Sequence, residues 1–239
     1  MKRTISIFLV ALLLVSATLL LAACDGGVYD EEGWNNAIQA LEDSQATSIK
    51  IVEKEYQNPL KVKKGRTETL AYNGKKGVLR WEREETAYNW LGGHDYDHHD
   101  CVYYVLDGSD LKYYRNINSY NFDDGWTVQV IHYDNKEEAL QDLHDLYVRR
   151  LPYLENIQFN TYNNQHTNGK FEKTSSDNYY DYTYQLQFSN GKLVKIYDVR
   201  EVNSSLGGTT LKTTTTIKYS AIVSAPKGIS NATEVTVQG

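Results

Sequence analysis

The sequence predicts an α+β fold in which a curved antiparallel β-sheet, a half-barrel of roughly 9–11 strands, packs on two helices. Three observations predict it. Segments in which apolar and polar residues alternate recur along most of the chain, as in strands with one covered face. Asn-Gly and Asp-Gly pairs separate neighbouring segments, as in antiparallel hairpins. Two other stretches, near the start and in the middle, show the spacing of an amphipathic helix.

Residues 1–23 have the composition of an export signal peptide. The chain opens with basic residues, and the apolar run that follows ends at the small residues Ala22 and Ala23. The run has about 17 residues, fewer than the roughly 20 that a helix needs to cross a hydrocarbon core. We therefore expect this segment to be removed after export.

The four residues Leu21-Ala22-Ala23-Cys24 resemble the lipobox of bacterial lipoproteins. The resemblance implies that the Cys24 thiol carries a diacylglyceryl group and that the chain is cut before this cysteine. Two or three acyl chains anchor a protein stably, since each buried methylene contributes about 0.8 kcal/mol. We expect a protein on the outer face of the cytoplasmic membrane of a Gram-positive bacterium, with a lipidated tether over residues 24–29 and one domain over residues 30–239. An ordinary secretory signal before a cysteine is the alternative.

The composition restricts the partners of this domain. Without residues 1–24, the chain has 23 basic and 31 acidic residues, a net charge of −8. An acidic balance argues against nucleic acid or an anionic lipid surface as a partner. Cys101 is the only other cysteine, so no intrachain disulfide is expected. The remaining chain is long enough for one domain with a substantial core.

The first elements are a helix and three strands. We expect the helix over residues 31–44, with Asp30 as its N-cap. The apolar residues that recur at helical spacing are Trp34, Ala37, Ile38 and Leu41. Strands are expected over residues 47–56, 62–72 and 77–85, the last two joined by Asn73-Gly74.

The middle of the chain contains a hairpin, a strand and the second helix. The hairpin is expected over residues 102–106 and 111–115, with its turn at Asp107-Gly108, and the strand over residues 126–133. Asp134 and Glu137 have the spacing of a capping box at the start of the helix. The apolar stripe of this helix, which ends before Pro152, consists of Leu140, Leu143, Tyr147 and Leu151.

The last third of the chain returns to strands. They are expected over residues 157–163, 169–173, 178–189, 192–202 and 209–222, with Asn190-Gly191 as one of the turns. Two of these strands alternate clearly. Their shared faces hold Tyr180, Tyr182, Tyr184, Leu186 and Phe188 in one, and Leu211, Thr213, Thr215, Ile217 and Tyr219 in the other.

This layout resembles that of known lipoproteins. The order of elements, with the stretches at 32–37 and 187–196, is similar to lipoproteins of Firmicutes and to the lipoprotein-carrier and mycobacterial lipid-binding lipoprotein superfamily. In that superfamily a curved sheet wraps helices around an apolar cavity for acyl chains or lipoproteins. The resemblance implies a cavity, which we expect to be lined by side chains such as Leu41, Leu143, Leu186 and Phe188. It assigns no ligand-contacting residue.

Residues 94–101 contain three His, three Asp and one Cys. Imidazole and carboxylate groups are ligands for zinc and other transition metals. An extended segment would put His94 and His98 on one face and His99 on the other, so the three could not bind one ion without a turn. We expect a polar loop between strands, and keep a metal site at these three histidines as the alternative.

No catalytic motif is recognisable, so we expect a protein that is not an enzyme and has no cofactor beyond the covalent lipid. His99 near Cys101 in the sequence does not amount to a nucleophile signature. The favoured function is a membrane-anchored carrier or binding module for an apolar ligand, lipid or envelope component. One alternative is an adhesion protein that binds carbohydrate or protein through exposed Tyr and Trp side chains, and the other is metal binding by residues 94–101. No protein partner is predicted.

Overall fold

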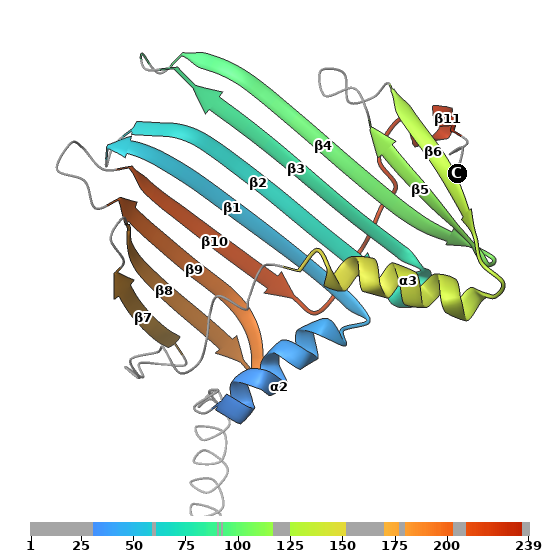
Figure 1. The fold of residues 1–239 in the computed structure, drawn as a ribbon, viewed down its shortest axis with the longest axis horizontal. Coiled ribbons are helices and arrows are strands. Elements are labelled where there is room, and N and C mark those ends of the chain that lie inside the picture. Colours follow the sequence, from blue (N-terminus) through green and yellow to red (C-terminus); the bar gives the residue numbers. More distant parts are fainter. Residues whose placement is uncertain are drawn as a thin grey trace, which may run out of the picture.

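The part of the chain that the structure describes forms one open β-sheet with two helices on one of its faces (Figure 1). This computed structural model describes residues 31–58, 61–89, 91, 93–116, 125–151, 170–176, 180–202 and 209–235. The sheet has 11 strands and is curved and unclosed, which confirms the predicted α+β half-barrel. Neither described helix is long and apolar enough to cross a bilayer. The signal segment, Cys24 and the tether lie outside the described residues.

The helices and strands follow one another along the chain in the predicted order, a helix and a run of strands, each twice. In chain order they are α2 (Glu31–Glu42), β1 (Ala46–Asn58), β2 (Lys61–Asn73), the 3₁₀ turn η1 (Gly74–Lys76), β3 (Val78–Tyr88), β4 (His94–Asp107), β5 (Asp110–Asn116), β6 (Trp126–His132), α3 (Lys136–Val148), β7 (Lys170–Ser176), β8 (Tyr180–Ser189), β9 (Lys192–Val202), β10 (Thr210–Lys218), the 3₁₀ turn η3 (Ile229–Asn231) and β11 (Thr233–Glu234). The strand predicted over 157–163 lies outside the described residues.

The sheet consists of two runs of hairpins that meet in its middle. Its order is β11-β6-β5-β4-β3-β2-β1-β10-β9-β8-β7. Each described pair is antiparallel except β11 with β6, which is parallel. Strands β1 and β10 join the two runs, with Ile49 opposite Ile217. Side chains alternate between two faces, and we call the face that the helices cover the inner face and the opposite one the outer face.

The core lies between the inner face and the two helices. A single cluster of buried residues includes Leu41 of α2, Leu143 of α3 and Leu79 of β3. Tyr72 and Tyr147 stack within it, with ring centroids 4.4 Å apart. The hydroxyl of Tyr147 donates a hydrogen bond of 2.7 Å to the carbonyl of Leu41, so it links α3 to α2. Offset aromatic stacking and the satisfied hydroxyl suit a site that is fully buried.

The polar segment before Cys101 was predicted wrongly as a loop. Residues 94–101 form the first half of β4 and pair along β3. The prediction failed because this half-strand carries polar side chains on both faces, so it lacks the apolar alternation that marks a half-buried strand. Its partners are polar as well, since Glu85 lies opposite His98 and Glu84 opposite His99.

The chain after β10 crosses the outer face. The last strand was predicted to reach residue 222 but ends at Lys218. From there residues 219–235, which we call the C-terminal strap, run across the sheet to its far edge (Figure 1). Asn73 Nδ2 and Arg80 Nη1 each donate a hydrogen bond of 3.3 Å to strap carbonyls, those of Ala221 and Ser224. The strap ends in β11, which pairs with β6 at the edge of the sheet.

Candidate functional site

Beyond the helices, the inner face of the sheet becomes charged. We define the charged patch by its residues on four strands, β1, β2, β3 and β9: Glu53, Lys64, Arg66, Glu68, Arg83, Glu85, Asp198 and Arg200. Strand register places several of them in one row across the sheet: Asp198 lies opposite Thr213, Thr213 opposite Glu53, Glu53 opposite Arg66, and Arg66 opposite Glu85. Acidic and basic residues of four strands therefore occupy neighbouring positions across the sheet, with Thr213 between Glu53 and Asp198.

In the central strands, the residues on the inner face change from apolar to charged along the strand, while side chains keep alternating between the two faces. In β2 the inner positions go from Tyr72 and Leu70, which belong to the core, to Glu68 and Arg66. The adjacent strand β3 shows the same change, from core leucine to charged residues at every second position. Because the helices cover only one end of these strands, the apolar residues lie beneath them and the charged residues lie past them.

Glu85 is the most buried carboxylate of the central strands. Its two oxygens accept from Lys64 Nζ at 2.9 Å, Tyr96 Oη at 2.9 Å and Arg83 Nη2 at 3.0 Å, and 6% of the residue is exposed. Burial alone would raise the pKa of Glu85, but the hydrogen bonds from Lys64, Tyr96 and Arg83 outweigh it and lower the pKa to about 2. Glu85 is therefore charged throughout the physiological range.

The neighbouring pairs continue this network towards the helices. Arg66 Nη2 lies 3.2 Å from Glu53 Oε2, and the indole Nε1 of Trp81 donates to Glu68 Oε1 at 2.7 Å. The guanidinium of Arg150 lies over the Trp81 ring, 4.8 Å from its centroid. Trp81 thus marks the border between the apolar core and the charged patch.

Three polar atoms of the patch have no hydrogen-bond partner. Among the described residues these buried atoms are Asp198 Oδ1, Arg66 Nε and Arg83 Nε. Asp198 is 6% exposed, and its other oxygen pairs with Arg200 Nη2 at 2.8 Å. Burial raises the pKa of Asp198, and the hydrogen bond from Arg200 only partly offsets this effect. A buried polar atom without a partner is uncommon in native proteins and needs an explanation.

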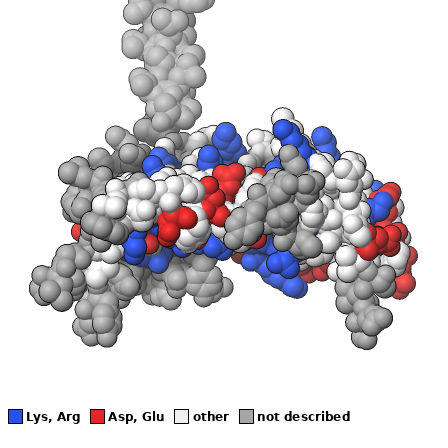
Figure 2. Space-filling view, turned by 90° about the horizontal axis from the view of Figure 1, so that it is seen from above, with Lys and Arg blue, Asp and Glu red and all other residues white. Residues whose placement is uncertain are grey.

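The patch offers hydrogen-bond donors and acceptors side by side instead of one sign of charge. Acidic and basic side chains are also interspersed on the face of the molecule that Figure 2 shows. A single anion or cation would meet like charges on such a surface, whereas a ligand that carries both donors and acceptors would not. Asp198 and Arg66 lie on strands that are three strand spacings apart in the sheet, or about 14 Å.

The three histidines predicted as metal-ligand candidates do not come together. His94 Nε2 lies 2.9 Å from Asp97 Oδ2, and His98 Nε2 lies 2.8 Å from Asp100 Oδ2. His99 instead projects from the outer face, where its Nε2 lies 2.8 Å from Glu82 Oε1. An extended strand separates His98 from His99 by the alternation of its side chains.

The residues expected to line an apolar cavity belong to the packed core instead. Leu41, Leu143, Leu186 and Phe188 are 0–1% exposed and lie in the one core cluster. This part of the prediction is corrected, because the helices dock directly on these side chains and fill the apolar half of the inner face. Side chains with almost no accessible surface leave no room for an acyl chain at these four positions.

The predicted aromatic surface is only partly described. Trp126 is 2% exposed and Trp81 is partly buried. Neither ring is therefore exposed enough to form the predicted binding surface. The register of β8 with β9 puts Tyr182 and Tyr184 at inner-face positions, but their side chains and Trp90 lie outside the description. Cys101 is buried, and burial raises the pKa of its thiol to about 12, so it is protonated at neutral pH.

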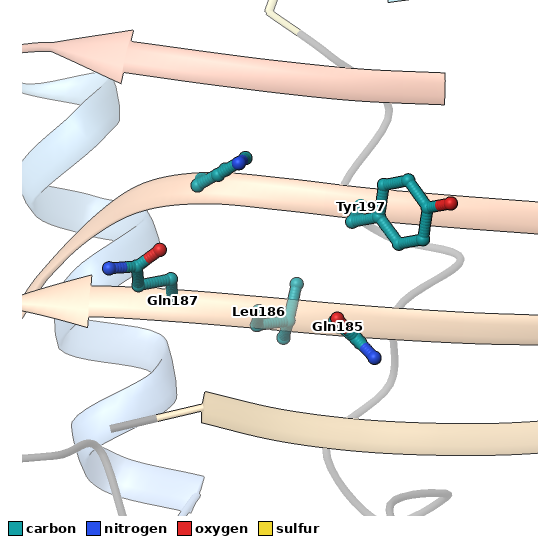
Figure 3. A pocket seen from close by; sticks show the side chains of 5 residues that line it. Gln185, Leu186, Gln187 and Tyr197 are labelled. Carbon is teal, nitrogen blue, oxygen red and sulfur yellow. The ribbon is translucent and has the colours of Figure 1, made fainter. Parts of the chain in front are cut away.

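Two hollows are bordered by described residues, and both have linings of mixed polar and apolar character. One, of about 540 Å³, lies where Tyr72 and Gln45 meet His144 and Gln141 of α3. The other, of about 220 Å³, lies between β8 and β9 on the outer face. Figure 3 shows Gln185, Gln187 and Tyr197 around it, on the side of the sheet away from α2.

Comparison with known proteins finds distant similarity to solved structures alone. No known protein family and no curated protein matches the chain. A solved structure of an S-type phycobiliprotein lyase from Guillardia theta is similar over 82% of this chain and 99% of that chain, with 6% sequence identity and a TM-score of 0.28. The expectation that the chain is not an enzyme is corrected, because the comparison gives it no support. At this level of similarity no activity passes to this chain either.

Proposed function

We propose that the protein is a membrane-anchored binding module that holds a polar headgroup of an envelope lipid on its charged patch. An open sheet whose inner face has a charged half that the described helices do not cover is compatible with a binding module. The ligand is the lipid or envelope component that the sequence suggests. It contacts the charged patch, which the described helices do not cover, and not the apolar side chains, which are packed in the core.

The observation that carries the proposal is the set of buried polar atoms without partners, Asp198 Oδ1, Arg66 Nε and Arg83 Nε. Burying a charged group is costly unless each of its polar atoms finds a partner, and the cost is recovered when a ligand supplies one. Asp198 would accept from a hydroxyl or ammonium group, and the two arginines would donate to phosphate or carbonyl oxygens. A ligand that contacts both Asp198 and Arg66 would span about 14 Å. That is the length of a sugar–phosphate headgroup and not of a single ion.

Native mass spectrometry tests the ligand. The full chain, purified in mild detergent, is incubated with total membrane lipids of its own host, and bound species are identified by mass. We expect a retained lipid, and at least about tenfold weaker retention in Asp198→Asn and Arg66→Gln, since each removes a contact to the headgroup. Lys54→Gln is the matched control, because Lys54 is an exposed cation on the outer face of the adjacent strand. Equal retention in all four proteins, or none in any, would contradict the proposal.

The anchor is tested separately. We expect the chain to fractionate with membranes and Cys24→Ala to appear in the soluble extracytoplasmic fraction, because two or three acyl chains are needed for stable anchoring. Intact mass should show the lipid at Cys24 as the first residue of the processed protein. Membrane association that persists unchanged in Cys24→Ala would exclude lipid at this cysteine as the anchor.

A second function, recognition of an envelope carbohydrate, is favoured by the outer-face hollow. Gln187, Lys195 and Tyr197 border it, and amide, ammonium and phenol groups are suited to sugar hydroxyls. Binding to soluble cell-wall oligosaccharides that is lost in Tyr197→Ala and kept in Asp198→Asn would favour this function over the first.

A further inference from the structure

The outer face of β3 and β4 contains a group of metal-ligating side chains that is separate from the charged patch. Glu82 and Glu84 lie two residues apart on β3, so both project from the outer face. His99 on β4 lies directly opposite Glu84 and diagonal to Glu82. The register of one hairpin therefore brings two carboxylates and one imidazole together.

The ligand atoms of these three residues converge. His99 Nε2 lies 2.8 Å from Glu82 Oε1 and 3.9 Å from Glu84 Oε1, and the three ligand atoms lie within 4.8 Å of one another. In a tetrahedral zinc site with bonds of about 2.1 Å, ligand atoms lie about 3.4 Å apart. The separations of 2.8 Å and 3.9 Å fall on both sides of this value, so the three ligand atoms lie at distances close to those of a coordination sphere.

A further contact holds one of the carboxylates in place. Arg80 Nη2 pairs with Glu82 Oε2 at 2.8 Å, which leaves Oε1 directed at His99. Arg80 itself is fixed by its hydrogen bond to the Ser224 carbonyl of the C-terminal strap. Residues that orient a ligating carboxylate in this way are a regular part of protein metal sites.

We propose that Glu82, Glu84 and His99 form a binding site for a divalent transition-metal ion, with zinc as the best fit. Two carboxylates and one imidazole supply three ligands and leave one position for water. The partial exposure of His99 and the greater exposure of Glu84 give the ion access from solvent. The site does not depend on the proposed function, because it lies on the opposite face of the sheet.

Calorimetric titration of the full chain in detergent with zinc chloride at neutral pH tests the site. We expect one zinc ion per chain, and at least about tenfold weaker binding in His99→Ala and in Glu84→Gln. Cobalt(II) provides a second measurement, since the wild type should develop visible absorption bands that both variants lack. The side chain of Glu84 is 62% exposed, so we expect Glu84→Gln to fold. This variant therefore tests the site even if His99→Ala fails to fold.

His132→Ala and His94→Ala are the matched controls. Each of these histidines is exposed and lies 2.9 Å from one aspartate oxygen, a single-carboxylate pair. We expect both variants to bind zinc as the wild type does. The proposal is overturned if the wild type binds no zinc, if His99→Ala and Glu84→Gln bind it unchanged, or if either control loses it.

Discussion

Glu85 remains charged although it is almost fully buried, because three donors surround it. The unfolded chain, in which the pKa of Glu85 is about 4.5, takes up the proton before the folded chain, in which it is about 2. The network therefore stabilises the fold fully above pH 4.5 and loses this contribution as the pH falls towards 2. Its partners Lys64 and Arg83 are about one-third exposed, so solvent screens the effect to about 1–2 kcal/mol.

Replacing this carboxylate should therefore change both stability and its pH dependence. In Glu85→Gln we expect the free energy of unfolding at pH 7 to fall by about 1–3 kcal/mol, because Lys64 and Arg83 lose their shared carboxylate. Urea unfolding between pH 7 and pH 2 should also show a weaker loss of stability in acid than the wild type. Glu84→Gln, which changes the exposed neighbour on the opposite face, should stay within about 0.5 kcal/mol. If the two variants behave alike, the network contributes nothing.

At the scale of the element, the start of α3 differs from its prediction by one residue. The N-cap is Asn135, whose Oδ1 accepts from the Glu138 backbone N–H at 2.9 Å, and its Nδ2 donates to Glu138 Oε1 at 2.9 Å. The predicted pair, Asp134 with Glu137, has the same spacing and precedes it directly. Sequence spacing alone cannot separate two overlapping capping boxes, because both offer a side-chain acceptor and an acid three residues later.

The two possible caps give a direct comparison. Asn135→Ala should lower the free energy of unfolding by about 1 kcal/mol, since it removes the acceptor for a helix N–H. Asp134→Ala should change it by less than about 0.5 kcal/mol. Thermal or urea unfolding of the two variants measures both. A larger effect at Asp134 than at Asn135 would favour the capping predicted from the sequence.

The hairpin turns provide a second comparison. The sequence predicts a tight turn at Asn73-Gly74, but η1 lengthens it, and the residue with positive φ is Gly77, at +63°. A Cβ there would lie 2.7 Å from Leu106 Cβ, whereas Gly108, with φ of +67°, has open space around it. Gly108→Ala should cost about 1–2 kcal/mol from backbone strain, and Gly77→Ala about 1–3 kcal/mol more from the clash. Equal losses in urea unfolding would contradict the clash.

Local patterns predict most elements but not the site. Helices and hairpins follow from periodicity and turn residues, which are properties of neighbouring positions. The charged patch depends on which strands pair and how far the helices extend, and a charged residue at an inner position looks in the sequence like one at the surface. The sequence did contain a sign of the charged patch. In β2 and β3, charged residues continue the series of alternate positions that begins with the core residues Leu70 and Leu79. Polar and charged side chains at inner positions are also the reason why residues 94–101 were predicted as a loop.

At the scale of the molecule, the C-terminal strap protects the open sheet. It crosses the outer face, buries Pro226 and pairs along β6, where Val235 N donates to the Val128 carbonyl at 2.8 Å. An exposed strand edge is a template for pairing with another chain. Nothing local in the sequence indicates this path, because the strap contacts strands far from it along the chain.

Removal of the strap should therefore expose this edge. We expect deletion of residues 220–239 to lower stability and to cause self-association, detected by light scattering after size exclusion. Amide hydrogen exchange in β6 should also become faster, since its partner β11 is gone. Deletion of residues 236–239 alone is the control and should leave the protein as it is. A truncated chain that stays monomeric with a protected β6 would show that the strap is dispensable.

The pairing of β1 with β10 affects the time at which the protein can fold. Ser48, at the start of the domain, pairs with Lys218, near its end, and this pair joins the two halves of the sheet. Contacts between such distant positions form slowly, because a long loop must close first. A chain that emerges from its amino end therefore keeps the β1 edge open until β10 has appeared. During that interval the chain is exposed to aggregation, and a chaperone that shields β1 would act in that period.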